Sequence, residues 1–245
     1  MPDISELLKS MTNRLVLANV VVYIVLQALF ADANNGLELY YWQHPEFRPW
    51  QIISYMFLHA GLTHLLFNMI ALWSFGRMLE RVWGAQRMLI FFLVCGVGAA
   101  LVHEAYSYFQ FQQITEILRN AGFSATQVQR LYVDGVGLSP QAMGVSLETQ
   151  RELYAVYNTP AVGASGAVYG ILVAFALLFP DFKIMLIFLP VPIAARYFVP
   201  VLLLIDLSAG VTGVSLFGYN IAHFAHLGGA LAGFLLVNYW ARTRA

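Results

Sequence analysis

The chain has few charged residues and almost no cysteine. Only 11% of its 245 residues are Asp, Glu, Lys or Arg, against roughly 25% in an average soluble domain. The 13 basic and 13 acidic side chains cancel, so no overall field favours a nucleic acid as partner. The single cysteine, Cys95, excludes an intramolecular disulfide, and we read it as a buried apolar thiol.

Hydrophobic residues are correspondingly abundant. They make up 60% of the chain, and the mean hydropathy is +0.67, so we expect a multi-pass integral membrane protein. Residues 1–14 carry both signs of charge, and the apolar run after them has no small-residue cleavage site. We therefore expect this run to be a retained first span rather than a cleaved signal. The whole chain, residues 1–245, is expected to form a single membrane domain.

The apolar runs predict six membrane spans and hence an all-α membrane protein, a bundle of six transmembrane helices. The runs cover about residues 15–31, 51–75, 88–103, 161–179, 184–208 and 220–240, and the fifth begins with a bent, proline-containing piece at the interface. Several are shorter than the roughly 20 residues that cross a hydrocarbon core. Some spans must therefore be buried among the others.

The basic residues indicate the orientation. With the N-terminus inside, nine of the 13 basic residues are cytoplasmic, and three of the other four fall in one long loop, where charge bias counts least. This distribution predicts that both termini are cytoplasmic. The nine are Lys9, Arg14, Arg77, Arg81, Arg87, Lys183, Arg196, Arg242 and Arg244.

Residues 104–160 are polar, with no run long enough to span, so we expect an extended extracytoplasmic loop between the third and fourth helices. Short amphipathic helices are predicted at 114–120, at 125–132 and at 147–157. Ser124 and Ser146 are the expected N-caps of the last two. This insert is either a folded element packed on the membrane surface or an element that recruits substrate, and the sequence leaves both open.

A Gly-x-Ser-Gly turn at residues 163–166 opens directly into the apolar fourth span. Polar side chains also occur in the second span, at His64 and Asn68, and in the sixth, at His226. All three spans run in the same direction. A rise of about 1.5 Å per residue places Ser165, His226 and His64 about 27, 24 and 20 Å above the basic residues at the inner ends of their spans. The three groups are therefore expected at a similar depth.

This set of side chains is suited to acyl transfer. Ser165 needs a base to take its proton, and His226 is the candidate because an imidazole titrates near neutrality. No acid in the spans is clearly placed as a third member of a triad. Asp206, near the outer end of the fifth span, is read as structural.

Three further groups would support that chemistry. His64 and Asn68 are four residues apart and share a helix face. Both can donate to a developing oxyanion, as can backbone N–H groups at the start of the fourth span, around Gly163. Tyr169 lies one turn after the serine and could stack on the His226 ring.

Taken together, the stretches 59–68 (HAGLTHLLFN), 163–170 (GASGAVYG) and 225–229 (AHLGG) resemble those of rhomboid intramembrane serine proteases. Glu80, between Gly76 and Gly84, also resembles the family's pattern. The resemblance covers about residues 15–240, apart from 104–160. It implies a six-span core and a Ser–His dyad with no acid.

By this resemblance, Ser165 would be the nucleophile and His226 the general base. His64, Asn68 and backbone N–H groups would form the oxyanion hole, and Tyr169 would support the histidine ring. The family cuts transmembrane substrates near their outer ends, so the implied partners are single-pass transmembrane proteins, besides lipid, with no nucleic acid and no cofactor. Substrates would enter between the second and fifth spans, and residues 208–219 would cap the site.

Two departures from the family pattern matter. Many members carry a Trp-Arg pair in the first loop, whereas here Gln51 follows Trp50 and Arg48 comes two residues earlier. This puts the anchoring of that loop in doubt. The third loop is also longer than in the smallest members, so it could restrict or select substrates.

Other functions remain as alternatives. A catalytically silent member would bind transmembrane helices without cutting them. A transporter is disfavoured, since no internal repeat is seen and the polar residues cluster toward one side. A metal or haem site at His59, His64, His223 and His226 is disfavoured because no carboxylate or thiolate is expected beside them. We expect no metal and a bacterial cytoplasmic membrane, and the oligomeric state is left open.

Overall fold

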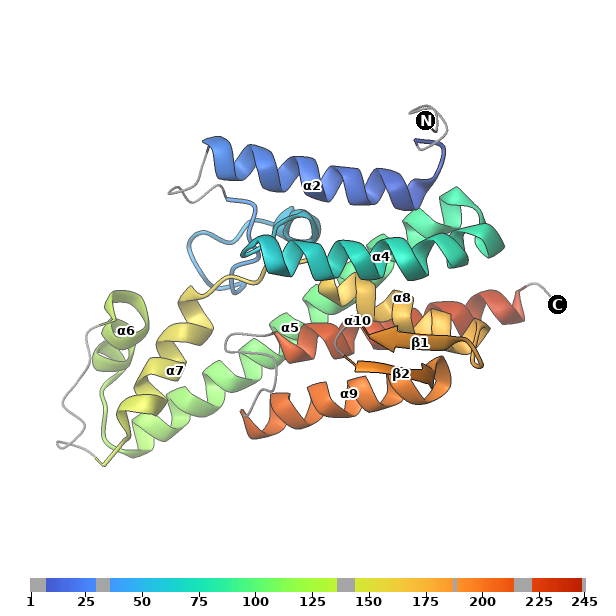
Figure 1. The fold of residues 1–245 in the computed structure, drawn as a ribbon. Coiled ribbons are helices and arrows are strands. Elements are labelled where there is room, and N and C mark those ends of the chain that lie inside the picture. Colours follow the sequence, from blue (N-terminus) through green and yellow to red (C-terminus); the bar gives the residue numbers. More distant parts are fainter. Residues whose placement is uncertain (1–7, 30–35, 136–143, 187–188, 214–221, 244–245) are drawn as a thin grey trace.

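The structure, a computed structural model, describes residues 8–29, 36–135, 144–186, 189–213 and 222–243. Figure 1 shows a bundle of helices in which a polar pair, α6 and α7, lies at one end. The helices are α2 (Met11–Leu29), α3 (Gln51–Ser54), the 3-10 turn η1 (Tyr55–Phe57), α4 (Leu62–Trp83), α5 (Ala85–Asn120), α6 (Ala125–Asp134), α7 (Leu147–Asn158), α8 (Ser165–Leu178), α9 (Ala195–Thr212) and α10 (His223–Arg242). The strands are β1 (Lys183–Leu186) and β2 (Leu189–Ala194).

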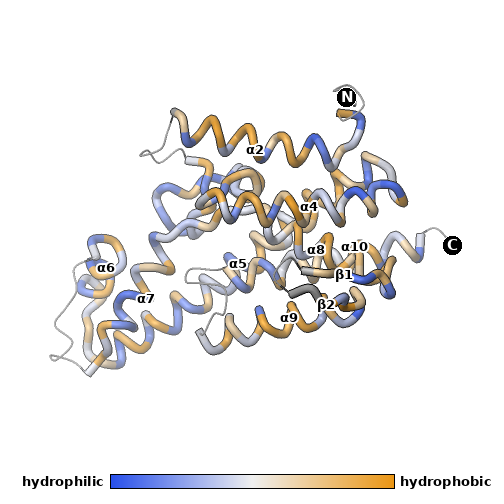
Figure 2. Tube along the Cα trace, viewed as in Figure 1, coloured by the Kyte–Doolittle hydropathy of each residue, from blue (hydrophilic) through white to orange (hydrophobic). Residues whose placement is uncertain are grey.

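The protein is an all-α membrane bundle. Within the described residues, α2, α5, α9 and α10 are long and apolar enough to cross a membrane, and the pair formed by α3–η1 and α4 is a fifth candidate. The remaining apolar helix, α8, has 14 residues. Figure 2 shows that hydrophobic residues dominate α2, α4 and α9, whereas α6 and α7 are mixed. The count of six spans stays a prediction.

Three helix boundaries differ from the expectation. The second span is not continuous, because the chain bends by 94° between η1 and α4. The third does not end near residue 103, since α5 continues as one helix to Asn120 and absorbs the short helix expected at 114–120. The fourth begins only at Ser165. In α5 apolar and polar residues stay mixed at helical spacing after residue 103, so the helix need not end where hydropathy falls.

The bent piece before the fifth span is a β-hairpin. Strands β1 and β2 pair antiparallel, with Lys183 opposite Ala194. Proline has no N–H to donate to a helix, which explains why the segment with Pro190 and Pro192 is extended. An ion pair between Arg196 and Asp181 joins the start of α9 to the turn after α8.

Helices α5, α8 and α10 form the centre of the bundle, where glycines allow their backbones to touch. A Cβ on Gly229 of α10 would lie 1.9 Å from the carbonyl oxygen of Gly166 in α8. A Cβ on Gly166 would in turn lie 2.3 Å from the Cβ of Ala99 in α5. Small residues are the usual means by which membrane helices approach closely.

The start of helix α2 is attached to α4 through the side chain of Glu80. The Glu80 carboxylate accepts hydrogen bonds from the backbone N–H groups of Met11 and Thr12, at 2.6 and 2.9 Å, and from the hydroxyls of Ser10 and Thr12, at 2.7 and 2.6 Å. It thus satisfies N–H groups that a helix N-terminus otherwise leaves unpaired. Glu80, noted in the sequence only as part of a pattern, caps α2 from another helix.

The polar insert has its own core. Ser124 caps α6 in a reciprocal capping box with Gln127, and Ser146 caps α7 by accepting a hydrogen bond from the Thr149 N–H at 3.0 Å. Both caps agree with the sequence prediction. A second hydrophobic cluster joins these helices to the last turns of α5 and to the first loop: Tyr41, Phe111, Ile114, Leu118, Phe123, Val128, Leu131, Val145, Leu153 and Tyr157.

Candidate active site

Ser165 is the first residue of α8, immediately after a turn that only glycine makes easily. Gly163 has φ = +130°, a backbone conformation unfavourable for any residue with a Cβ. Its N–H donates to the carbonyl of Tyr55 at 2.9 Å, and the Tyr55 hydroxyl donates to the carbonyl of Gly96 at 2.8 Å. The turn that presents the serine is therefore attached to both η1 and α5.

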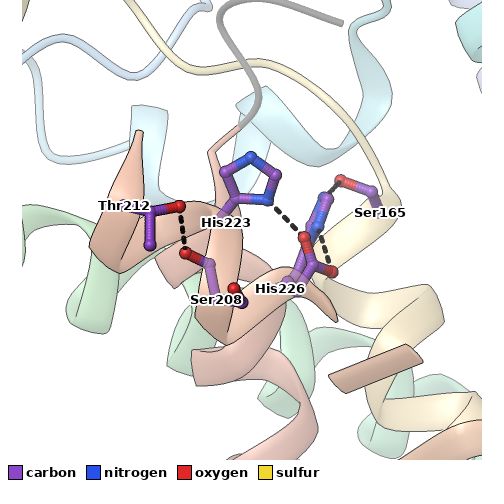
Figure 3. A network of polar contacts seen from close by, with 6 residues as sticks. Ser165, Ser208, Thr212, His223 and His226 are labelled. Atoms are coloured by element: carbon purple, nitrogen blue, oxygen red, sulfur yellow. Dashed lines mark hydrogen bonds and ion pairs between the residues drawn. The ribbon is translucent and has the colours of Figure 1, made fainter. Parts of the chain in front are cut away.

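His226, in the first turn of α10, faces this serine (Figure 3). Its Nε2 lies 2.9 Å from Ser165 Oγ. The contact depends on the glycine packing described above, because Gly229 is one turn further along α10 and Gly166 directly follows the serine. Two side chains 61 positions apart in the chain are thus within hydrogen-bonding distance inside an apolar bundle.

Tyr169 stacks on the His226 ring. The two ring centroids are 4.2 Å apart and the planes are inclined by only 12°. Since Tyr169 follows Ser165 by one turn of α8, the nucleophile candidate and the support for its base come from the same short helix. The side chain lies where the sequence interpretation placed it.

An acid is also present, contrary to the sequence interpretation. Asp206 of α9 is 3% exposed, and its Oδ2 lies 3.1 Å from His226 Nδ1. Its other oxygen, Oδ1, bonds His223 Nδ1. The statement that no acid is placed beside His226 was therefore wrong, whereas the structural role read for Asp206 stays a prediction. Helix α9 runs opposite to α8 and α10, so the outer end of α9 lies where their first turns begin.

His64 and Asn68 are both on α4, on the other side of the serine turn. A Cβ on Gly163 would lie 2.8 Å from His64 Nε2 and 3.5 Å from Ser165 Oγ, so the histidine and the serine flank the glycine. Asn68 is 5% exposed, and its amide nitrogen is buried without a hydrogen-bond partner among the described residues. A buried donor left unpaired is costly, which is consistent with a ligand oxygen as its partner.

Asp206, His223 and His226 form a cluster of potential metal ligands. One ligand atom from each lies within 4.8 Å of the others, close enough to hold a metal ion. The argument that no carboxylate stands beside the histidines was therefore wrong for His223 and His226. Both ring nitrogens that face the carboxylate are engaged with it in this arrangement. The expectation of no metal stays a prediction.

The expected cap at residues 208–219 lies partly outside the described residues. Residues 208–212 belong to the last turns of α9, and 214–221 are not described. The role of the polar insert in substrate selection and the orientation of the termini stay predictions as well.

Comparison with known proteins gives a consistent assignment. The rhomboid domain family model matches residues 46–243. Rhomboid protein 1, mitochondrial, from Saccharomyces cerevisiae is 28% identical over 184 residues, which are 75% of this chain and 40% of that protein. Rhomboid protease AarA from Providencia stuartii is 29% identical over 181 residues, 67% of this chain and 49% of that protein. RHOMBOID-like protein 12, mitochondrial, from Arabidopsis thaliana is 29% identical over 196 residues, 79% of this chain and 46% of that protein.

The chain spans less than half the length of these three curated relatives. Two of them are mitochondrial by name. The family therefore supports an integral membrane protein, while a bacterial cytoplasmic membrane stays a prediction.

Proposed function

Because this chain belongs to the rhomboid family, we propose that it is an intramembrane serine endopeptidase. Its substrates are single-pass transmembrane proteins, cut near the outer face of the membrane. One observation carries the proposal: Ser165 Oγ and His226 Nε2 are 2.9 Å apart within an apolar helix bundle. A hydroxyl hydrogen-bonded to an imidazole is the arrangement that nucleophilic catalysis by serine requires.

The reaction proceeds in two acyl-transfer steps. Ser165 Oγ attacks the scissile carbonyl carbon while His226 Nε2 takes the hydroxyl proton. The protonated ring then gives that proton to the amine of the leaving peptide, and the C–N bond breaks. Water, deprotonated by the same nitrogen, releases the acyl group and restores the serine.

The negative charge of each tetrahedral intermediate falls on the former carbonyl oxygen. Donors aimed at that oxygen lower the barrier, and removal of one typically costs about 10²–10³ in rate. The Asn68 amide, the His64 ring and the backbone N–H groups around the start of α8 are the candidates. The unpaired Asn68 nitrogen and the place of His64 against Gly163 support this role.

The test is labelling by a fluorophosphonate, which reacts covalently with activated serines, on the protein purified in detergent. Wild type should be labelled and should cut a transmembrane segment that carries a helix-destabilising sequence. Ser165→Ala and His226→Ala should do neither, although both variants should still be folded at the assay temperature. Ser107→Ala removes another buried hydroxyl and serves as the matched control, expected to label like wild type.

Two results would count against the proposal. Equal labelling of Ser165→Ala and wild type would remove Ser165 from the nucleophile role. A folded wild type that binds the transmembrane segment but neither cuts it nor reacts with the probe would be a silent member of the family.

A further inference from the structure

Asp206 is a buried carboxylate in a membrane bundle, and such a group needs an explanation. An isolated carboxylate in an apolar interior carries a desolvation cost large enough that it is normally paired or neutralised. Asp206 has two partners on α10. His226 and His223 each direct Nδ1 at one of its two oxygens.

These partners determine which nitrogen of His226 carries the proton. An ionised carboxylate can only accept hydrogen bonds, so the Nδ1 that faces Asp206 must be the N–H of the neutral ring. Nε2 is then left with its lone pair, and Nε2 is the atom 2.9 Å from Ser165 Oγ. Without the acid, the two tautomers would compete, and the Nε2–H form cannot take a proton from the serine.

We infer that Asp206 is a positioning residue for His226, so that this chain works with a Ser165–His226–Asp206 triad rather than with a dyad. The inference rests on the proposed protease function. The three members come from three helices, the serine from α8, the histidine from α10 and the aspartate from α9. Asp206 acts through the histidine and does not touch the substrate.

The proton transfers keep Asp206 ionised throughout. When Nε2 takes the Ser165 proton, the ring becomes an imidazolium whose Nδ1–H still points at the carboxylate. The negative charge stabilises this cation until Nε2 passes the proton to the leaving amine. No proton moves to Asp206, and the carboxylate is unchanged at the end of the cycle.

His223 holds the aspartate in this position. It precedes His226 by three residues on α10, and its ring is nearly perpendicular to that of His226, at an interplanar angle of 87°. Each of the two rings therefore engages a different carboxylate oxygen. With both oxygens engaged, the carboxylate has little freedom to rotate away from His226 Nδ1.

The first experiment compares Asp206→Asn with wild type in cleavage and labelling. The amide has the same shape but no charge, and its NH₂ can donate to Nδ1 and select the wrong tautomer. We expect kcat to fall by about 10²–10⁴, as in other serine hydrolases that lose this acid, while KM stays within about twofold because substrate binding is untouched. Glu104→Gln, which neutralises another partly buried acid that accepts from the Trp42 N–H, is the matched control and should keep wild-type kcat.

A purely structural role gives a different pattern. Asp206→Asn would then lose thermal stability and folded yield, but the folded fraction would keep wild-type kcat, and this outcome would overturn the inference. Loss of wild-type activity on treatment with a metal chelator would also overturn it, since Asp206, His223 and His226 would then be metal ligands.

A second measurement needs no change at Asp206. In ¹⁵N-histidine-labelled wild type, the nitrogen shifts of His226, assigned by their loss in His226→Ala, should be those of the Nδ1–H tautomer. An Nε2–H ring would contradict the inference even if Asp206→Asn failed to fold. Absence of any cleavage or labelling in wild type would refute the protease function, and the tautomer would still report whether Asp206 orients His226.

Discussion

The middle and the end of α5 are packed in opposite ways. In the middle, α5 meets other helices through small residues: a Cβ on Gly98 would lie 2.5 Å from that of Ala232 in α10, and Ala99 packs on Gly166 of α8. Near its end, it meets α7 and the first loop through rings, with Phe111 5.4 Å from Tyr41 and 5.9 Å from Tyr157. One continuous helix therefore uses close backbone contact in its middle and bulky side chains at its end.

The difference is the one expected if, as the sequence predicts, the insert lies in water outside the membrane. Lipid tails are as apolar as leucine, so membrane helices gain little by burying large side chains and associate through close packing. In water, burial of apolar area is the main driving force. Tyr41 is 3% exposed, and burial raises its pKa to about 12, so the aromatic cluster is packed like a soluble core.

The largest effect on the labelling of Ser165 should come from a single methyl group in the glycine-packed region. In Gly229→Ala the new Cβ would lie 1.9 Å from the Gly166 carbonyl oxygen, so α8 and α10 must move apart. Because overpacking costs about 1–3 kcal/mol and occasionally more, we expect a lower unfolding midpoint and no fluorophosphonate labelling at Ser165.

The control is Gly61→Ala. Its backbone is extended, with φ = 179°, and a Cβ there would have nothing within 4 Å. It should label like wild type. Normal labelling of Gly229→Ala would show that the helices tolerate separation at the serine.

A local effect that spares Ser165 is expected at the aromatic end. Leu153 of α7 is fully buried, and Leu→Ala in a core typically costs about 2–5 kcal/mol. We expect Leu153→Ala to open the insert to limited proteolysis within residues 125–158 while labelling at Ser165 stays at the wild-type rate. Arg151→Ala, at an exposed position of the same helix, should leave the digestion pattern unchanged. Loss of labelling in Leu153→Ala would mean that the two regions of α5 fold as one unit.

The smallest effect concerns the cap of α6. Ser124→Ala removes an N-cap hydroxyl and half of the capping box with Gln127, at a cost of about 1 kcal/mol. We expect faster hydrogen exchange at the Gln127 amide, with no change in α5. Thr126→Ala, an exposed neighbour in the first turn of α6, should exchange like wild type. An equal increase in both variants would contradict a specific role for the Ser124 cap, since alanine is a better helix former than serine or threonine.

Local signals were read correctly from the sequence. The N-caps Ser124 and Ser146 and the serine turn each depend on residues within one or two helical turns. Counting the helical rise from the inner ends of the spans predicted that Ser165 and His226 lie at a similar depth in the membrane, because α8 and α10 run in the same direction. Their contact follows from the glycines that were quoted with the motifs.

What was missed depends on relations between distant elements. Asp206 pairs with His226 across 20 residues and two antiparallel helices. The depth of Asp206 was not calculated from the helical rise, because α9 runs opposite to α8 and α10. The bend before α4 and the continuation of α5 past residue 103 follow from tertiary packing, which hydropathy does not report. Glu80 caps a helix 68 to 70 positions earlier in the chain, a pairing that no local pattern contains.

The length of α8 has a consequence for the second reactant. At about 1.5 Å per residue, its 14 residues make a helix about 21 Å long, against a hydrocarbon core about 30 Å thick. If its last residue reaches one interface, Ser165 lies only about 9 Å below the other. In the proposed reaction, the water that hydrolyses the acyl group then has only the depth of a few molecules to cross, because the helix that carries Ser165 begins so far inside the span.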